Sequence, residues 1–472
     1  MLSRIGIASL SALMYLLPSI APANVTMEEL QGAWLGSMQV PDGPKLRVGV
    51  EIFQKADGSW GGNVASPDQG VRYMTVGSVS LREDVLRVEL AGAPLYVSGK
   101  VDLDARQITG EFVQGSSSFD LQLESVAALP EITRPQTPEG ELPYEEVEVR
   151  IHNAPDQIWL AGSLTVPADD LKHPAVLLLA GSGPSHRDAY SEGHRPFKVL
   201  ADDLTRRGYV VLRADKRGVY KSGGNYIGAE TADFARDAEA AIRFLRQHPR
   251  VDASKIGLIG HSEGSLVAAM AAVSEPVQTI VSMAGPGLSV HEILLLQDQT
   301  EPAAKGASAA EVQVLLDFSQ RFYQTALEAP DSIERKARLQ ALYDNMGEAQ
   351  AAIVNRWNDR IGTLNVDYAA RDSFVDFLQN DPARYWQQIS TPVLVLNGGK
   401  DVQVSAEENV TAILAALKKR KARAESKIFP DLNHMFQKAE TGGTDEYGQI
   451  SESLNPALLT TVNRWLERTL AP

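Results

Sequence analysis

Two hydrophobic patterns follow one another along this chain. Over residues 24–128, apolar and polar residues alternate in short stretches: residues 46–52 read Leu-Arg-Val-Gly-Val-Glu-Ile, and residues 119–124 read Phe-Asp-Leu-Gln-Leu-Glu. Such alternation gives a strand one apolar and one polar face, as in an antiparallel sheet that packs on one side. We therefore predict a small accessory antiparallel β sandwich or barrel over residues 24–128.

Strand and helix patterns alternate from residue 145 onward. Residues 145–166 predict an antiparallel pair of strands, and residues 175–180 (Ala-Val-Leu-Leu-Leu-Ala) are apolar throughout, which is typical of a central parallel strand. Residues 231–247 carry apolar side chains at helical spacing. The alternation predicts a mostly parallel sheet with helices on both faces, built from residues 145–286 and 389–472.

Residues 129–144 separate the two patterns. They hold four prolines in an acidic, polar stretch. This composition predicts a linker at a domain boundary rather than a packed element.

The strand pattern is interrupted over residues 287–388, which predict helices instead. An insertion beyond the C-terminal ends of the strands falls where an α/β sheet binds ligands. We therefore predict a helical cap or lid over the site, with a purely structural helical domain as the alternative. The predicted helices span residues 294–299, 309–328, 333–345 and 372–378. The candidate aromatic residues for a cap pocket or cap core are Phe318, Phe322, Tyr323, Tyr343, Trp357, Tyr368 and Trp386.

The N-terminus has the pattern of an export signal. Arg4 precedes a mostly apolar stretch over residues 5–17, and Ala21-Pro22-Ala23 is a small-residue cleavage pattern. We predict a signal peptide over residues 1–23, cut after Ala23, and a periplasmic or secreted protein. A retained membrane anchor is the alternative, and no later stretch is apolar enough to span a bilayer.

Charge and composition exclude several function classes. The chain has 472 residues, a net charge of −15 and no cysteine. A surface this acidic argues against nucleic acid as a partner, because phosphate binding needs basic side chains. The lack of cysteine excludes catalytic thiols, disulfides and thiolate-bound metals.

A five-residue motif carries the candidate chemistry. Gly260-His261-Ser262-Glu263-Gly264 follows an apolar strand pattern and precedes a small-residue helical pattern. Gly-x-Ser-x-Gly between a strand and a helix is typical of a nucleophile elbow. The serine there takes a strained backbone conformation, and side chains at the glycine positions would collide with the neighbouring strand and helix. Ser262 is the candidate nucleophile.

A serine nucleophile needs a base, usually a histidine oriented by a carboxylate. After the elbow serine we expect the acid and then the histidine. His291 has no acid loop before it in that order, whereas His434 follows the last strand pattern. Asp401 follows an apolar strand pattern and a glycine turn, at a strand end where catalytic groups collect. We predict His434 as base and Asp401 as acid; an ordinary turn or N-cap role is the alternative for Asp401.

Acyl transfer also needs two backbone N–H groups aimed at the developing oxyanion. One is predicted at Glu263, the first residue of the elbow helix. The other is predicted at Ser182 in the loop Ala180-Gly181-Ser182-Gly183-Pro184, with the neighbouring Gly183 as the alternative. Small residues in this loop let the backbone approach a substrate.

Three motifs together resemble one group of bacterial serine esterases with the α/β-hydrolase fold. They are Gly181–Pro184 as the oxyanion loop, Asp215–Gly218 as an Asp-Lys-Arg-Gly turn and Gly260–Gly264 as the elbow. Members often carry an extra N-terminal β domain. The resemblance runs from about residue 145 to the C-terminus and implies hydrolysis of carboxylic esters without a cofactor or metal. The chain departs from the group at Ser265, where a second glycine is usual, and at His186, where an acidic residue is usual.

Three side chains near these motifs have two interpretations each. His186, in the loop after the oxyanion motif, either contacts substrate together with Gly183 or occupies a tolerant surface loop. Lys216 and Arg217 either neutralise an acidic substrate or form buried structural ion pairs, and we favour the ion pairs.

The sequence predicts an exported serine carboxylesterase that hydrolyses small-molecule esters through a Ser-His-Asp triad and an acyl-enzyme intermediate. A prolyl-oligopeptidase-like serine peptidase is the first alternative, because the same triad cleaves amides. Residues 24–128 are too few for the seven blades, of about forty residues each, of the propeller that usually accompanies such peptidases. A non-catalytic binding protein that keeps the hydrolase fold is the second alternative. The sequence makes no prediction of oligomeric state.

Overall fold

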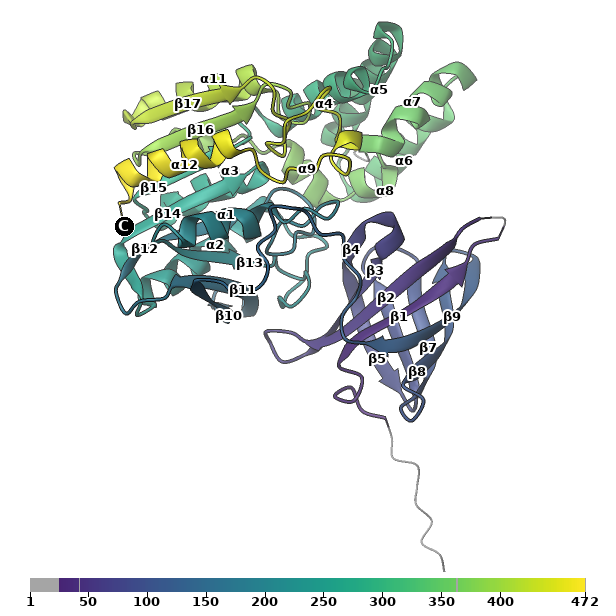
Figure 1. The fold of residues 1–472 in the computed structure, drawn as a ribbon. Coiled ribbons are helices and arrows are strands. Elements are labelled where there is room, and N and C mark those ends of the chain that lie inside the picture. The colour runs from purple at the N-terminus through teal and green to yellow at the C-terminus, as the bar shows by residue number, and fades with distance from the viewer. Residues whose placement is uncertain (1–24, 42, 362–363, 472) are drawn as a thin grey trace, which may run out of the picture.

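Two β-sheets organise the chain (Figure 1). The computed structural model describes residues 25–41, 43–361 and 364–471, so the predicted signal peptide and its cleavage point lie outside the described residues. A nine-stranded antiparallel sheet forms the N-terminal domain, and an eight-stranded mixed sheet forms the domain that follows it. Helices inserted into the second domain lie above the first domain in Figure 1.

The N-terminal sheet curls into a barrel, one of the two predicted forms. Its strand order is β4-β3-β2-β1-β9-β8-β7-β6-β5. The two ends of the sheet approach each other, since a Cβ at Gly62 of β3 would lie 3.0 Å from Val79 of β5. Val48, Val50 and Ile52 point into the barrel core. The strands are β1 (Gly32–Gln39), β2 (Lys45–Gln54), β3 (Trp60–Ser66), β4 (Val71–Met74), β5 (Val76–Arg82), β6 (Val85–Leu90), β7 (Leu95–Asp102), β8 (Gln107–Gln114) and β9 (Ser117–Val126).

The second sheet has the order β10-β11-β13-β12-β14-β15-β16-β17. β10 and β11 pair antiparallel as predicted, β11 is antiparallel to β13, and the other neighbours are parallel. The strands are β10 (Tyr144–Asn153), β11 (Ile158–Pro167), β12 (His173–Leu179), β13 (Val210–Ala214), β14 (Val251–His261), β15 (Thr279–Met283), β16 (Val393–Gly398) and β17 (Ala424–Phe429).

Helices cover both faces of this sheet. On one face lie α2 (Thr231–Gln247), α3 (Glu263–Ser274) and α11 (Ala406–Leu417); on the other lie α1 (Pro196–Thr205) and α12 (Pro456–Thr469). The apolar strand β12 serves both layers, because alternate side chains point to opposite faces: Leu177 packs with the first set and Leu178 with the second. The predicted α/β-hydrolase fold is confirmed.

The insertion between β15 and β16 is helical, as predicted, and its apolar residues form a core of their own. The structure has more helix here than the sequence predicts. Residues 348–361 form a helix that was not among those predicted. The cap helices are α4 (Val290–Ala304), α5 (Ala309–Glu328), α6 (Ser332–Asp344), α7 (Glu348–Ile361), α8 (Val366–Ala369), α9 (Asp372–Leu378) and α10 (Ala383–Trp386).

The segment predicted as a linker, residues 129–144, differs from the expectation. It has no helix or strand before β10, yet it is packed: Leu129 is buried against the barrel, and Glu131 pairs with both Arg72 and Arg195. The side chain of Gln136 bonds to backbone groups of residues 453 and 454 at the far end of the chain. The proline content of this segment correctly predicted that it lacks regular secondary structure. It could not predict the packing, because the contacts join residues that are far apart in the sequence.

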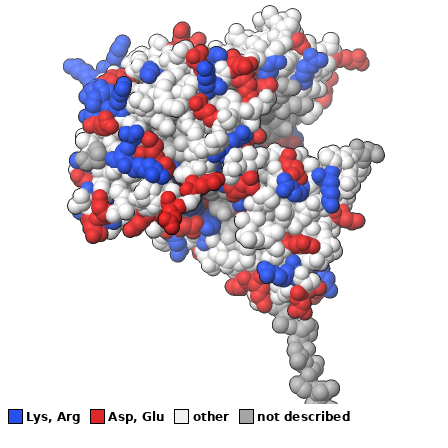
Figure 2. All heavy atoms as spheres, viewed as in Figure 1, with Lys and Arg blue, Asp and Glu red and all other residues white. Residues whose placement is uncertain are grey.

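Acidic and basic side chains are interspersed over the face shown in Figure 2. The same view shows a hollow between the barrel and the cap. Among the described residues, no helix has both the length and the apolar character needed to cross a membrane.

Candidate active site

Ser262 lies in the sharp turn between β14 and α3. Its backbone has φ 54° and ψ −127°, a conformation that costs energy for a residue with a side chain. A Cβ at Gly260 would lie 2.2 Å from the carbonyl oxygen of Gly264, and a Cβ at Gly264 would lie 2.1 Å from that of Leu179. The predicted steric reason for the two glycines is therefore confirmed.

Ser265 occupies the position where a second glycine is usual in the resembling group. Its side chain is completely buried, and its hydroxyl donates to the carbonyl oxygen of Gly260 at 2.7 Å. This bond satisfies the hydroxyl inside the turn, so the substitution is accommodated without an unpaired buried polar group.

Asp401 and His434 form a buried hydrogen-bonded pair. His434 Nδ1 lies 2.8 Å from Asp401 Oδ2, and the other carboxylate oxygen accepts backbone N–H groups of Gln403 and Val404 at 2.9 and 2.8 Å. Asp401 is thus fixed by its own turn while it orients the imidazole. Because a carboxylate only accepts, Nδ1 carries the proton of a neutral His434 and Nε2 keeps its lone pair.

A second histidine holds the His434 loop against the elbow. His261 Nε2 donates to the carbonyl oxygen of His434 at 2.9 Å, and the two rings lie 4.8 Å apart. Burial, with a smaller contribution from His434, lowers the pKa of His261 to about 3, so this ring is neutral. His261 was not among the residues predicted to act in the site. The sequence shows that His261 precedes Ser262, but its hydrogen-bond partner, His434, lies 173 residues further along the chain.

The predicted oxyanion loop reaches the nucleophile. A Cβ at Gly181 would lie 2.9 Å from the Cβ of Ser262, so the loop backbone packs directly on the elbow. Ser182 and Glu263 line both cavities next to the elbow, whereas Gly183 lines only the larger. The structure therefore brings Ser182 and Glu263 together beside Ser262.

The smaller of these cavities, about 240 Å³, contains Ser262 and is mostly apolar. Its apolar wall comes from the elbow helix, from the cap and from loops that follow β15 and β16: Leu266, Val290, Ile293, Leu294, Phe377, Pro286 and Val404. The cap thus walls the space next to the nucleophile. Of the seven aromatic residues that were candidates for a cap pocket, all within the described part of the chain, only Tyr368 lines these cavities, and it lines both.

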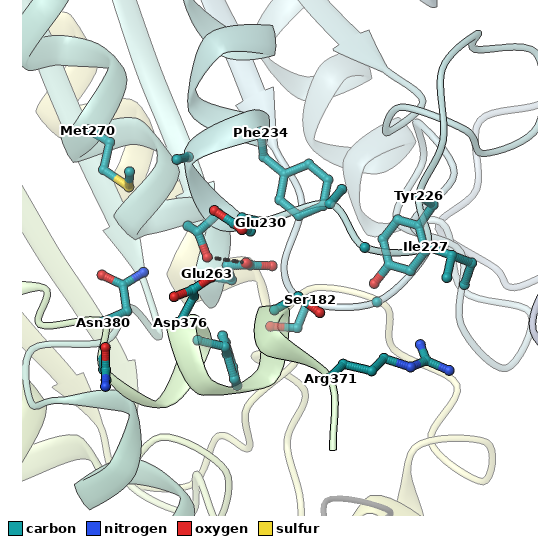
Figure 3. A pocket seen from close by; sticks show the side chains of 18 of the residues that line it. Ser182, Tyr226, Ile227, Glu230, Phe234, Glu263, Met270, Arg371, Asp376 and Asn380 are labelled. Atoms are coloured by element: carbon teal, nitrogen blue, oxygen red, sulfur yellow. Dashed lines mark hydrogen bonds between the residues drawn. The ribbon is translucent and has the colours of Figure 1, made fainter. Parts of the chain in front are cut away.

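The larger cavity, about 540 Å³, is lined by polar and apolar groups in similar proportion and shares Ser182 and Glu263 with the smaller one. In Figure 3, Glu230, Glu263 and Asp376 lie together near the middle, and Tyr226 and Arg371 lie toward the right. Burial, and then the negative charge of Asp376, raise the pKa of Glu230.

The Asp-Lys-Arg-Gly turn forms ion pairs, as favoured from the sequence. Lys216 Nζ lies 3.2 Å from Glu263 Oε2, with both side chains largely buried. Arg217 pairs with Asp237 at 2.8 Å and with Asp156 at 2.6 Å. The preference for structural ion pairs is confirmed.

His186 fits neither of its two interpretations, a substrate contact or a tolerant surface loop. The side chain is only 7% exposed and does not line either cavity next to the elbow. Its ring stacks on Tyr73 of the barrel, with centroids 4.3 Å apart and planes 5° apart. His186 therefore belongs to the interface between the two domains. The sequence could not indicate this, because the partner lies in another domain.

His291, the rejected candidate base, lies on α4 near Tyr323 in the cap. Asp401, the predicted acid, is paired with His434 instead.

Comparisons with known proteins show the family of the chain. The family model of the X-Pro dipeptidyl-peptidase (S15 family) matches residues 156–435, more than half of the chain, and this span includes Ser262, Asp401 and His434. Esterase EstD of Thermotoga maritima is 22% identical over 373 residues, which cover 78% of this chain and 76% of the relative.

Solved structures are similar as well. The Pyrococcus furiosus esterase Pf2001 is 19% identical, with a TM-score of 0.41, and the match covers 72% of this chain and 99% of that one. The α/β hydrolase GrgF from Penicillium sp. sh18 is 19% identical, with a TM-score of 0.43, covering 70% of this chain and 100% of that one. The family match and the fold identify a hydrolase of the serine type. The chain belongs to the X-Pro dipeptidyl-peptidase (S15) family.

Proposed function

We propose that this protein is a serine carboxylesterase in which Ser262 is the nucleophile, His434 the general base and Asp401 the residue that orients His434. The observation that carries the proposal is the 2.8 Å contact between His434 and Asp401, because His261, the neighbour of the strained elbow serine, bonds to the backbone of His434. A hydroxyl becomes an effective nucleophile only when such a base accepts its proton.

In this mechanism Ser262 Oγ attacks the ester carbonyl carbon while His434 Nε2 accepts the hydroxyl proton. The negative charge that develops on the carbonyl oxygen is stabilised by the backbone N–H groups of Ser182 and Glu263. When the tetrahedral intermediate collapses, His434 donates the proton to the departing alkoxide and the alcohol leaves. Water, activated by His434, then hydrolyses the acyl-enzyme by the same steps and releases the carboxylic acid.

The two cavities support a division of the ester between them. The apolar cavity of about 240 Å³ that contains Ser262 suits a short or medium acyl chain, because apolar surface is best buried against apolar walls. The larger cavity, which meets it at Ser182 and Glu263 and also carries the charged side chains of Glu230, Asp376 and Arg371, suits a larger and more polar alcohol group.

The test compares wild type with Ser262→Ala on p-nitrophenyl acetate and butyrate. We expect the variant to lose at least about 10³-fold in kcat, while its unfolding temperature stays near that of wild type. A fluorophosphonate probe should label wild type and leave the variant unlabelled. Undiminished ester hydrolysis by Ser262→Ala would refute the proposal, and failure of folded wild type to react with the probe would favour a non-catalytic binding protein.

A peptidase is the second candidate, and the family match is the observation that favours it. The carboxyl groups of Glu230 and Asp376 in the larger cavity offer a binding partner for the protonated amino terminus of a peptide. Turnover of an X-Pro p-nitroanilide faster than that of the simple esters, lost in Asp376→Asn, would place the peptidase ahead of the esterase.

We also propose that residues 1–23 direct export and that the mature chain begins at Asn24, in the periplasm or outside the cell. The support is the charged, apolar and small-residue pattern of those residues. The N-terminal sequence of the protein recovered from periplasmic and culture fractions tests this. An unprocessed chain held in the membrane fraction would favour the retained anchor.

A further inference from the structure

The barrel contacts the hydrolase domain through the loop that carries Ser182. Tyr73, on the short strand β4, places its ring flat on His186, four residues beyond Ser182. The edges of Tyr190 and Tyr220, both from the hydrolase domain, surround the Tyr73 ring at centroid distances of 5.4 and 5.2 Å. An aromatic cluster of this kind favours one relative orientation of its rings.

His186 acts in this cluster as a neutral ring. Burial lowers its pKa to about 4, and this effect exceeds the opposing influence of Asp215 and Asp188. The imidazole therefore contributes a flat, uncharged face, and the contact with Tyr73 is a packing contact between two rings rather than an ion pair.

The residues after His186 are anchored in the same place. The backbone N–H and the guanidinium of Arg187 both bond to the buried carboxylate of Asp215, at 2.9 and 2.7 Å. Arg195 joins the domains by pairing with Asp188 at 2.7 Å and with Glu131 at 2.6 Å.

Ser182 thus lies between two fixed points. On one side Gly181 packs against Ser262, and on the other the loop is held at His186 by the barrel. Only Gly183, Pro184 and Ser185 separate Ser182 from that second point, and the carbonyl oxygen of Ser185 also accepts from the Lys216 N–H at 3.2 Å.

We propose that Tyr73 is a positioning residue for catalysis: by stacking on His186 it fixes the loop that presents the Ser182 N–H to the oxyanion. This inference rests on the proposed ester hydrolysis at Ser262 and gives the accessory barrel a part in it. Tyr73 itself touches no reacting atom. Its effect is on the transition state, because the oxyanion forms only after Ser262 attacks.

The test uses the full-length chain with three substitutions. Tyr73→Ala removes the ring, and Tyr73→Phe keeps the stack while removing the hydroxyl that Arg195 approaches at 3.4 Å. Tyr96→Ala is the control, because Tyr96 packs under the guanidinium of Arg87 within the same barrel. Each variant is measured for kcat and KM on p-nitrophenyl butyrate, for inhibition by a trifluoromethyl ketone whose adduct carries an oxyanion, and for thermal unfolding.

We expect Tyr73→Ala to lower kcat by about 10- to 100-fold with KM within about 3-fold, as for a donor misplaced by a fraction of an ångström to an ångström. The affinity for the trifluoromethyl ketone should fall in parallel. Tyr73→Phe and Tyr96→Ala should both keep kcat within about 3-fold of wild type.

Wild-type kcat in folded Tyr73→Ala overturns the proposal, and so does a change confined to KM. If the alanine variant does not fold, Tyr73→Leu replaces it, since leucine keeps apolar bulk without a flat ring; wild-type kcat there has the same consequence. Failure of the proposed function is distinguishable, because it appears in wild type and Ser262→Ala whatever the residue at position 73.

Discussion

His434 Nδ1 and Asp401 Oδ2 lie 2.8 Å apart, and the second oxygen of Asp401 is bonded to two backbone N–H groups of its own turn. The Asp401 carboxylate therefore stabilises its own turn and also fixes the tautomer of His434, the candidate base. Removing its charge while keeping its shape separates these two contributions.

Asp401→Asn should lower kcat for ester hydrolysis by about 10³- to 10⁴-fold, because an amide can donate to Nδ1 and stabilise the wrong histidine tautomer. The asparagine oxygen can still accept from the turn, so the unfolding temperature should change little. Steady-state kinetics and thermal unfolding measure the two effects. Asp431→Asn, an exposed aspartate on the His434 loop, is the control and should keep wild-type kcat. Comparable losses in both variants would contradict the assignment of Asp401.

Gly264→Ala should destabilise the fold by about 3 kcal/mol or more, because the new Cβ would lie 2.1 Å from the carbonyl oxygen of Leu179. Urea unfolding measures the free energy of unfolding. Gly347→Ala is the matched control, since a Cβ there meets nothing within 4 Å. Equal stability of the two variants would show that the elbow can relax around a side chain.

Leu294→Trp should shift the acyl preference toward shorter chains, because Leu294 of the cap lines the 240 Å³ cavity beside Ser262. We expect kcat/KM on p-nitrophenyl butyrate to fall at least about 10-fold and that on acetate to fall about 3-fold or less. Ile333→Trp, at a cap position that is 83% exposed, is the control for a tryptophan in the cap. An unchanged ratio of butyrate to acetate in Leu294→Trp would place the acyl chain elsewhere.

Asp298→Asn should make stability less dependent on pH. Asp298 lies in the cap, where burial and, to a smaller extent, Glu301 raise its pKa to about 7, and Tyr323 donates to its Oδ2 at 2.9 Å. The folded protein therefore binds more protons than the unfolded chain between about pH 4 and pH 7, so this group lowers stability as pH rises through that window.

The asparagine variant lacks this titration. From pH 5 to pH 7 we expect wild type to lose about 2 kcal/mol relative to the variant, because the slope of about 1.4 kcal/mol for each pH unit flattens as the pH approaches the folded pKa. Urea unfolding at several pH values measures this difference. Parallel stability curves for the two proteins would contradict the assignment.

The sequence by itself determined the fold class and the candidate triad. Local patterns were sufficient because each feature is carried by neighbouring residues: an apolar run such as residues 175–180 predicts a buried strand, and Gly260–Gly264 contains its own steric reason for glycine. The chain order of Ser262, Asp401 and His434 then selected one histidine of two.

The tertiary structure alone decided the contacts between distant parts of the chain. The roles of His261 and His186 depend on partners that are remote in sequence, His434 and Tyr73, and no local pattern encodes such pairs. The packing of residues 129–144 and the presence of two cavities at the site also depend on contacts between residues that are distant in the sequence. Burial and stacking depend on which elements the fold brings together, and hydrophobic periodicity specifies only the faces that must be covered.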